Sequence, residues 1–107
     1  MFRGTTPTHK FNVNVNLQAT RVFLTYKQRG SIVVEKDSNV DTETLTIDEN
    51  SVTVTLSQED TLKFNYNEGV EIQIRAVYED GKAIASSIIT TYVDKILKDG
   101  EIAYADA

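Results

Sequence analysis

Few residues of this chain combine a type and a spacing that could do chemistry. The only histidine is His9, and there is no cysteine. A Ser-His-Asp triad, a Cys-His pair and a histidine-based zinc site therefore cannot be assembled within one chain. A catalytic histidine also needs an orienting partner and a nucleophile, and the sequence indicates neither. We expect His9 to be a structural or simply exposed residue.

Carboxylates are numerous enough to suggest a glycosidase pair, for example Glu59 or Asp60 with Asp94. Such a pair works only when a pocket raises the pKa of one carboxyl group and the separation suits the reaction. A chain of this size has little room for a deep cleft. We therefore expect no catalytic residue, no cofactor and no enzymatic activity.

Oxygen ligands at alternating positions suggest a calcium loop at Asp37, Asn39 and Asp41. Thr42 stands at the sixth position in place of glycine, and Asp48 stands at the twelfth in place of glutamate. No flanking helices are predicted. A polar loop between strands is the favoured interpretation, although the sequence leaves cation binding at these three residues open.

Composition limits the classes of partner. The 107 residues carry a net charge of -5, which opposes sequence-independent binding to nucleic acid because phosphate neutralisation needs a surplus of lysine and arginine. No apolar run approaches the length that spans a bilayer, and no export signal is recognisable. We expect one soluble domain, residues 1–107, with neither a nucleic-acid nor a membrane partner.

The elements are organised around residues 70–91, which are predicted to form a β-hairpin. Asp80-Gly81 between alternating apolar residues favours a two-residue turn. In that register Tyr78 faces Ala83 and Ile72 faces Ile89. One face is expected to be the core, and its residues are Val70, Ile72, Ile74, Ala76 and Tyr78.

Alternating apolar residues predict further short strands, which are 9–17, 21–27, 32–35, 45–47 and 52–56. In the first of them Phe11, Val13, Val15 and Leu17 are expected to face inward. Ser57 is predicted to cap one helical turn. Residues 1–8 contain the only proline and are expected to form an extended N-terminal arm.

Together these elements predict an all-β fold. About seven short strands with one short helical turn are typical of a single-domain antiparallel β-sandwich of immunoglobulin-like type. A partly open β-barrel is the alternative.

Three stretches of the sequence carry a resemblance to a known group of proteins: residues 2–9, 56–62 and 70–75. They resemble short proteins of tailed bacteriophages and prophages of Gram-positive bacteria. The resemblance implies a virion structural protein, assembled in the bacterial cytoplasm as a tail or baseplate component. It further implies other phage structural proteins as partners, with a homo-oligomer possible, and it carries over no catalytic or binding residue.

Two other functions stay open from the residues alone. One is a cell-surface or carbohydrate-binding sandwich module that uses Tyr26, Tyr66 or Tyr92 as exposed platforms. The other is a small phage-encoded regulator that blocks a host protein through its acidic surface. If the chain is a virion component, the arm at residues 1–8 is the expected contact with a neighbouring copy.

Overall fold

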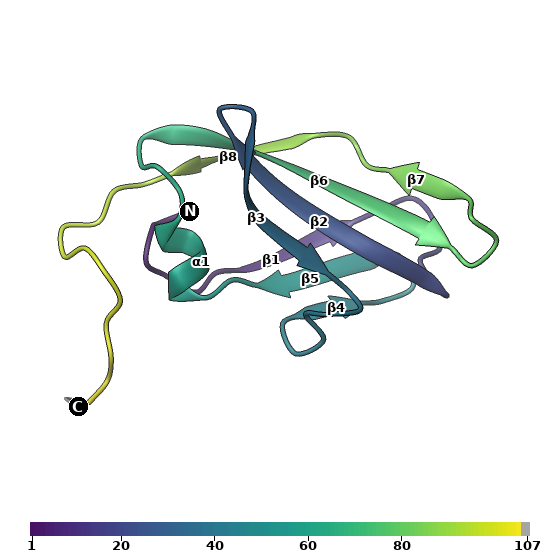
Figure 1. The fold of residues 1–107 in the computed structure, drawn as a ribbon, viewed down its shortest axis with the longest axis horizontal. Helices are drawn as coiled ribbons and strands as arrows, with labels where there is room; N and C mark the ends of the chain where they lie inside the picture. Colours follow the sequence, from purple (N-terminus) through teal and green to yellow (C-terminus); the bar gives the residue numbers. More distant parts are fainter. Residues whose placement is uncertain (106–107) are drawn as a thin grey trace.

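Two antiparallel sheets pack face to face in the computed structural model, which describes residues 1–105 (Figure 1). The last two residues of the predicted domain lie outside the described part. The smaller sheet has the order β1 (Thr8–Asn12), β5 (Ser51–Thr55), β4 (Leu45–Ile47). The larger has the order β3 (Ser31–Asp37), β2 (Thr20–Gln28), β6 (Glu68–Tyr78), and one side of β6 pairs successively with β8 (Ile89–Val93) and β7 (Ala83–Ala85). This confirms the all-β sandwich.

The strand order is that of an immunoglobulin-like fold without its first strand. In that fold strands B, E and D form part of one sheet, and strands C, F and G form the other, extended by C′ in some members. Here β1, β5 and β4 occupy the B, E and D positions, and β3, β2, β6 and β8 occupy C′, C, F and G. Among the described residues β1 pairs only with β5, so its outer edge is open where strand A would lie.

The core lies between the sheets and follows the predicted alternation. Val22, Leu24 and Tyr26 of β2 and Val52 and Val54 of β5 are fully buried. The predicted inward face of β6 is buried at Val70, Ile72, Ile74 and Ala76. Tyr78 is only half-buried, because its hydroxyl reaches the protein surface and donates a hydrogen bond to the Asn16 carbonyl, 2.6 Å away.

Two further hairpins are present, and the helical turn forms as predicted. Arg29 and Gly30 both have positive φ, 51° and 77°, so a two-residue turn joins β2 to β3. A turn at residues 48–50 joins β4 to β5. Ser57 caps α1 (Gln58–Leu62), and the Asp60 carboxylate accepts a hydrogen bond from the Ser57 backbone amide, which completes a capping box.

The hairpin after β6 differs from its predicted register near the turn. Tyr78 pairs with Lys82 in place of Ala83, because Gly81, at φ 90°, is a third loop residue. The register is restored further along, where Ile72 does pair with Ile89. One extra residue therefore lies between β7 and β8, opposite Gln73 and Ile74. There the Ser86 side chain accepts a hydrogen bond from the Ile74 amide.

The first strand is shorter than its alternation predicts. β1 ends at Asn12, and the chain then bends around the turn that joins β4 to β5. The amides of Val13 and Leu17 donate to the carbonyls of Asn50 and Glu49. Leu17 is buried as expected, whereas Val15 is exposed.

The N-terminal segment, predicted as an extended arm, is held against its own chain in the structure. Phe2 forms a parallel β-bridge with Asp94 just beyond β8. The Arg3 side chain donates to the carbonyls of Leu62 and Phe64. The Pro7 carbonyl accepts a hydrogen bond from the Leu56 amide. A proline-containing polar segment can thus be fixed by its backbone and one arginine without entering a sheet.

Candidate functional site

His9 links the two sheets through a hydrogen bond. It lies on β1, and its Nδ1 is 2.7 Å from the hydroxyl of Tyr26 on β2. Burial lowers the pKa of His9, and the positive N-terminus lowers it further. Burial and the nearby Asp60 carboxylate raise the pKa of Tyr26. A neutral imidazole bonded to a neutral phenol suits a structural contact between sheets.

The three carboxylates considered as a glycosidase pair have separate roles in the structure. Asp60 is buried in the capping box and forms an ion pair with Lys36 at 3.0 Å. Burial opposes its ionisation, but the hydrogen bonds from Ser57 and the Lys36 charge prevail and hold the pKa of Asp60 below its usual value. A general acid needs a raised pKa. Glu59 is exposed, and Asp94 lies 3.5 Å from the N-terminal amine.

The loop considered for calcium uses its carboxylates internally. Asp37 accepts two hydrogen bonds from the Arg21 guanidinium, at 3.0 and 2.5 Å. Asp41 accepts a hydrogen bond from the Asp37 amide, and the Asn39 amide donates to the Asp37 carboxylate. Within residues 1–105 no three histidine or acidic side chains come together as metal ligands would.

The tyrosines considered as platforms lie in different environments. Tyr26 is fully buried in the core, so it is excluded as a surface platform. Tyr66 and Tyr92 are exposed. The Tyr66 ring lies beside two cations, with the Arg3 guanidinium carbon 5.9 Å and the Lys95 Nζ 5.2 Å from its centroid. Those cations occupy the space beside the Tyr66 ring that a stacked sugar would need.

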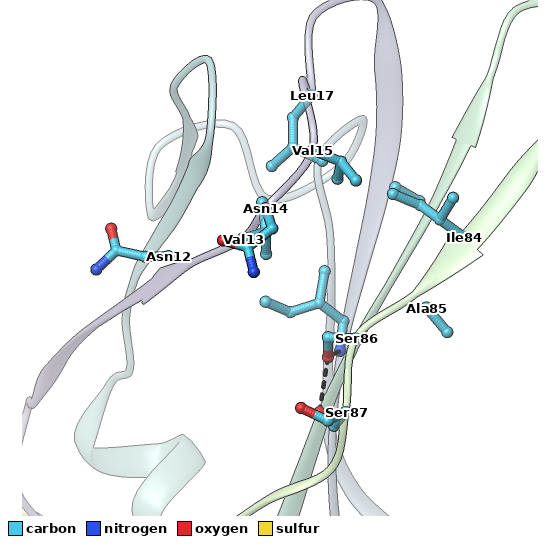
Figure 2. A pocket seen from close by; sticks show the side chains of 11 residues that line it. Asn12, Val13, Asn14, Val15, Leu17, Ile84, Ala85, Ser86 and Ser87 are labelled. Atoms are coloured by element: carbon cyan, nitrogen blue, oxygen red, sulfur yellow. Dashed lines mark hydrogen bonds between the residues drawn. The ribbon is translucent and has the colours of Figure 1, made fainter.

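The most apolar groove among the described residues has a volume of about 350 Å³ and lies between the open edges of the two sheets. One wall is the stretch after β1, with Val13, Val15 and Leu17, and the other wall is β7. Figure 2 shows the Ile84 side chain pointing from β7 toward Val15 and Leu17, while Ala85 points away. Ile74 and Ala76 of β6 also line the groove. The lining also includes polar residues, which are Asn12, Asn14, Ser86 and Ser87.

The sequence places Val13 and Val15 in the core, because the predicted first strand continues through Leu17. Period-two alternation does not reveal where a strand leaves its sheet. The bend at residues 13–17 separates the two sheet edges and opens the groove. The asparagines at 12, 14 and 16, which are unusual in a strand, were the available signal for that bend.

Several exposed apolar residues lie at the C-terminal end of the described chain. Beyond β8, Leu97 is 98% exposed, Ile102 57% and Tyr104 108%. Ile102 and Tyr104 are separated by one residue and alternate with Ala103 and Ala105. We refer to residues 101–105 as the tail segment.

Comparison with protein-family models, with curated proteins and with solved structures found no match to this chain. In the described part of the chain no helix is long and apolar enough to cross a membrane.

Proposed function

We propose that this chain is a non-enzymatic structural protein of a bacteriophage or prophage, a tail or baseplate component that acts through protein-protein contacts. The phage origin rests on the sequence resemblance at residues 2–9, 56–62 and 70–75. The contact role rests on the groove between the sheet edges. Unpaired strand edges with apolar residues beside them are surfaces that pair readily with another chain.

The open strand edges of this sandwich favour a role in protein-protein contacts. Its loops offer less support for a small-ligand site. Strand β1 has one open edge, and β7 is three residues long and pairs only with β6 among the described residues. Natural monomeric sandwiches protect such edges by keeping the edge strand very short, as β7 is, or with charged residues, proline or a covering segment. The wall of this groove instead presents valine, isoleucine and alanine.

The test of the proposed function is mass spectrometry of purified particles from an induced lysogen or an infected host. We expect the chain at a fixed copy number relative to the tail proteins. A host protein of similar size and abundance serves as the control for material that adheres to particles. If the chain is abundant in the lysate and absent from particles, it is not a virion component.

A further inference from the structure

We propose that the tail segment of one copy adds as a β-strand to the β7 edge of a second copy and fills the groove there. This contact deepens the proposed function, on which it rests, by naming a second copy of the chain as the partner. The donor is the apolar tail segment at one end of the molecule. The acceptor is the apolar groove beside the unpaired edge of β7 at the other end.

The donor has the side-chain pattern of a strand that is buried on one face. Successive side chains of a strand point to opposite faces, so Ile102 and Tyr104 share one face, and Ala103 and Ala105 share the other. In its own copy the Gln58 side chain bonds both the amide and the carbonyl of Ile102, at 2.8 and 3.0 Å. Residues 104–105 form a bend in this structure, so the segment must straighten on binding; once extended, its backbone row at residues 101, 103 and 105 faces away from Gln58 and is available to a second partner.

The acceptor has an unpaired backbone row directly beside the groove. The Ser86 amide donates to the Ile74 carbonyl, and Ile84 pairs with Ala76, so the backbones of Ile84 and Ser86 face β6. By antiparallel alternation the amide and carbonyl of Ala85 face away from β6. A strand added there would place every second side chain next to Ile84, over the groove, and the intervening side chains next to Ala85.

The positions of the tail segment and the groove favour a second copy over the same chain. The described residues measure 48 Å along their longest axis. In Figure 1 the C-terminal trace runs from β8 past α1, whereas β7 lies at the opposite end. Two contacts hold the tail near α1: the Ile102 pair with Gln58, and an ion pair at 2.8 Å between Asp99 and Arg3. The same chain would have to lose both contacts to reach its own groove.

The first experiment compares the mass of full-length variants by light scattering after size exclusion, from micromolar to millimolar concentration. We expect the wild-type mass to rise above 12.0 kDa with concentration. The donor variant Ile102→Ser/Tyr104→Ser is expected to stay at the monomer mass, because it removes the two side chains that fill the groove. The control Leu97→Ser removes another exposed apolar residue, outside the tail segment, and is expected to associate as the wild type does.

The acceptor is tested with Ala85→Pro, which removes an amide that faces away from β6 and leaves the β6 ladder intact. Its matched control is Glu35→Pro, on β3 at the opposite edge of the same sheet. Loss of association in Ala85→Pro alone supports the proposal. Association of Ala85→Pro or of the donor variant at wild-type strength overturns it, as does a wild-type chain that stays monomeric at every concentration.

Cysteine cross-linking gives an answer even if a proline variant fails to fold. The chain has no cysteine, so introduced thiols are unique. We expect Ala85→Cys and Ala103→Cys copies, mixed under oxidising conditions, to form a disulfide-linked dimer, because both side chains lie on the face away from the groove. A mixture of Glu35→Cys and Ala103→Cys is expected not to cross-link. Equal cross-linking in both mixtures, or none in the first, overturns the proposal.

The outcomes separate this contact from the proposed function. If the chain associates through the tail segment but is absent from particles, the contact is supported and the virion role is contradicted. If the chain is present in particles but its tail and Ala85 variants associate as the wild type does, the virion role is supported and this contact is contradicted.

Discussion

At the residue scale, a polar cluster joins the sheets at the α1 end of the sandwich. Lys36 of β3 forms an ion pair with Asp60 of α1, and both side chains are largely buried. His9 and Tyr26 are joined by their hydrogen bond, and the Asp60 charge acts on the Tyr26 hydroxyl. A buried charge is tolerated only when it is paired and hydrogen-bonded, so each member depends on the others.

Replacing Asp60 tests this dependence. Asp60→Asn removes the ion pair and leaves the Lys36 ammonium without its partner, which should cost about 1 to 3 kcal/mol of unfolding free energy at neutral pH. The pKa of Asp60 is lowered in the folded state, so its contribution is full above the unfolded pKa and is lost as pH falls through the folded pKa. Urea unfolding should therefore show a smaller loss of stability in acid for Asp60→Asn than for the wild type.

The control is Glu59→Gln, in the same helical turn. Glu59 is exposed, and its removal should change the unfolding free energy by less than about 0.5 kcal/mol. A loss at Glu59→Gln as large as that at Asp60→Asn would show that helix-dipole charge, and not the buried pair, carries the effect.

His9 predicts a second, milder acid dependence. Burial lowers the folded pKa of His9 below its unfolded value of about 6.5, so the unfolded chain binds the proton first. Stability is then full above the unfolded pKa and decreases as pH falls toward the folded pKa. We expect thermal melts between about pH 7 and pH 5 to show this decrease in the wild type. Melts of His9→Gln should lack it, and an identical pH profile would contradict the role given to burial.

At the element scale, substitutions at two glycines distinguish the effect of backbone conformation on stability from the effect of packing. Gly81 has φ 90° in the loop between β6 and β7, and a Cβ added there would meet no atom within 4 Å. Gly81→Ala should therefore destabilise by about 1 kcal/mol through backbone strain alone. Gly69 lies within β6, where a Cβ would make an ordinary 3.6 Å contact with Thr90. Gly69→Ala should be neutral or stabilising by up to about 1 kcal/mol.

Chemical denaturation of the two glycine variants measures the difference. A loss at Gly69→Ala as large as that at Gly81→Ala would indicate that the strand position is more crowded than its contacts show. An unchanged Gly81→Ala would mean that the three-residue loop relaxes to another conformation.

The hairpins illustrate which features of the fold could be predicted from the sequence. Alternation identified the buried face of β6 because each of its inward positions carries an apolar side chain. It could not fix the loop length at Gly81, since two- and three-residue loops both accept a glycine with positive φ. A bulge at Ser86 then restored the pairing of Ile72 with Ile89, a compensation that no local pattern predicts.

The candidate site was less predictable than the fold for a related reason. The groove depends on how far two sheet edges lie apart, and that distance is set by the bend at residues 13–17 and by the shortness of β7. The N-terminal segment shows the same limit. Its composition suggests a free arm, whereas Arg3 fixes it through carbonyls some 60 residues away in the chain.

At the scale of the whole molecule, the tail and the groove define a contact between unlike surfaces. A contact of that kind is heterologous, so each copy can donate at one end and accept at the other. Successive copies then form a ring if the rotation between neighbours closes, and an open filament if it does not. Both forms fit the proposed role of a component that is repeated around or along a phage tail.

If the contact is heterologous, two variants that cannot associate alone should associate when mixed, but through a single contact. Ile102→Ser/Tyr104→Ser retains its groove but has no donor, whereas Ala85→Pro retains its donor but has no acceptor edge. An equimolar mixture should therefore form dimers of twice the 12.0 kDa chain mass and nothing larger, because each dimer ends in one defective donor and one defective acceptor. Sedimentation velocity of the mixture, with each variant alone as the control, measures this limit. Dimers in either variant alone would instead indicate a two-fold contact between identical surfaces, and larger assemblies in the mixture would mean that one defective end still binds.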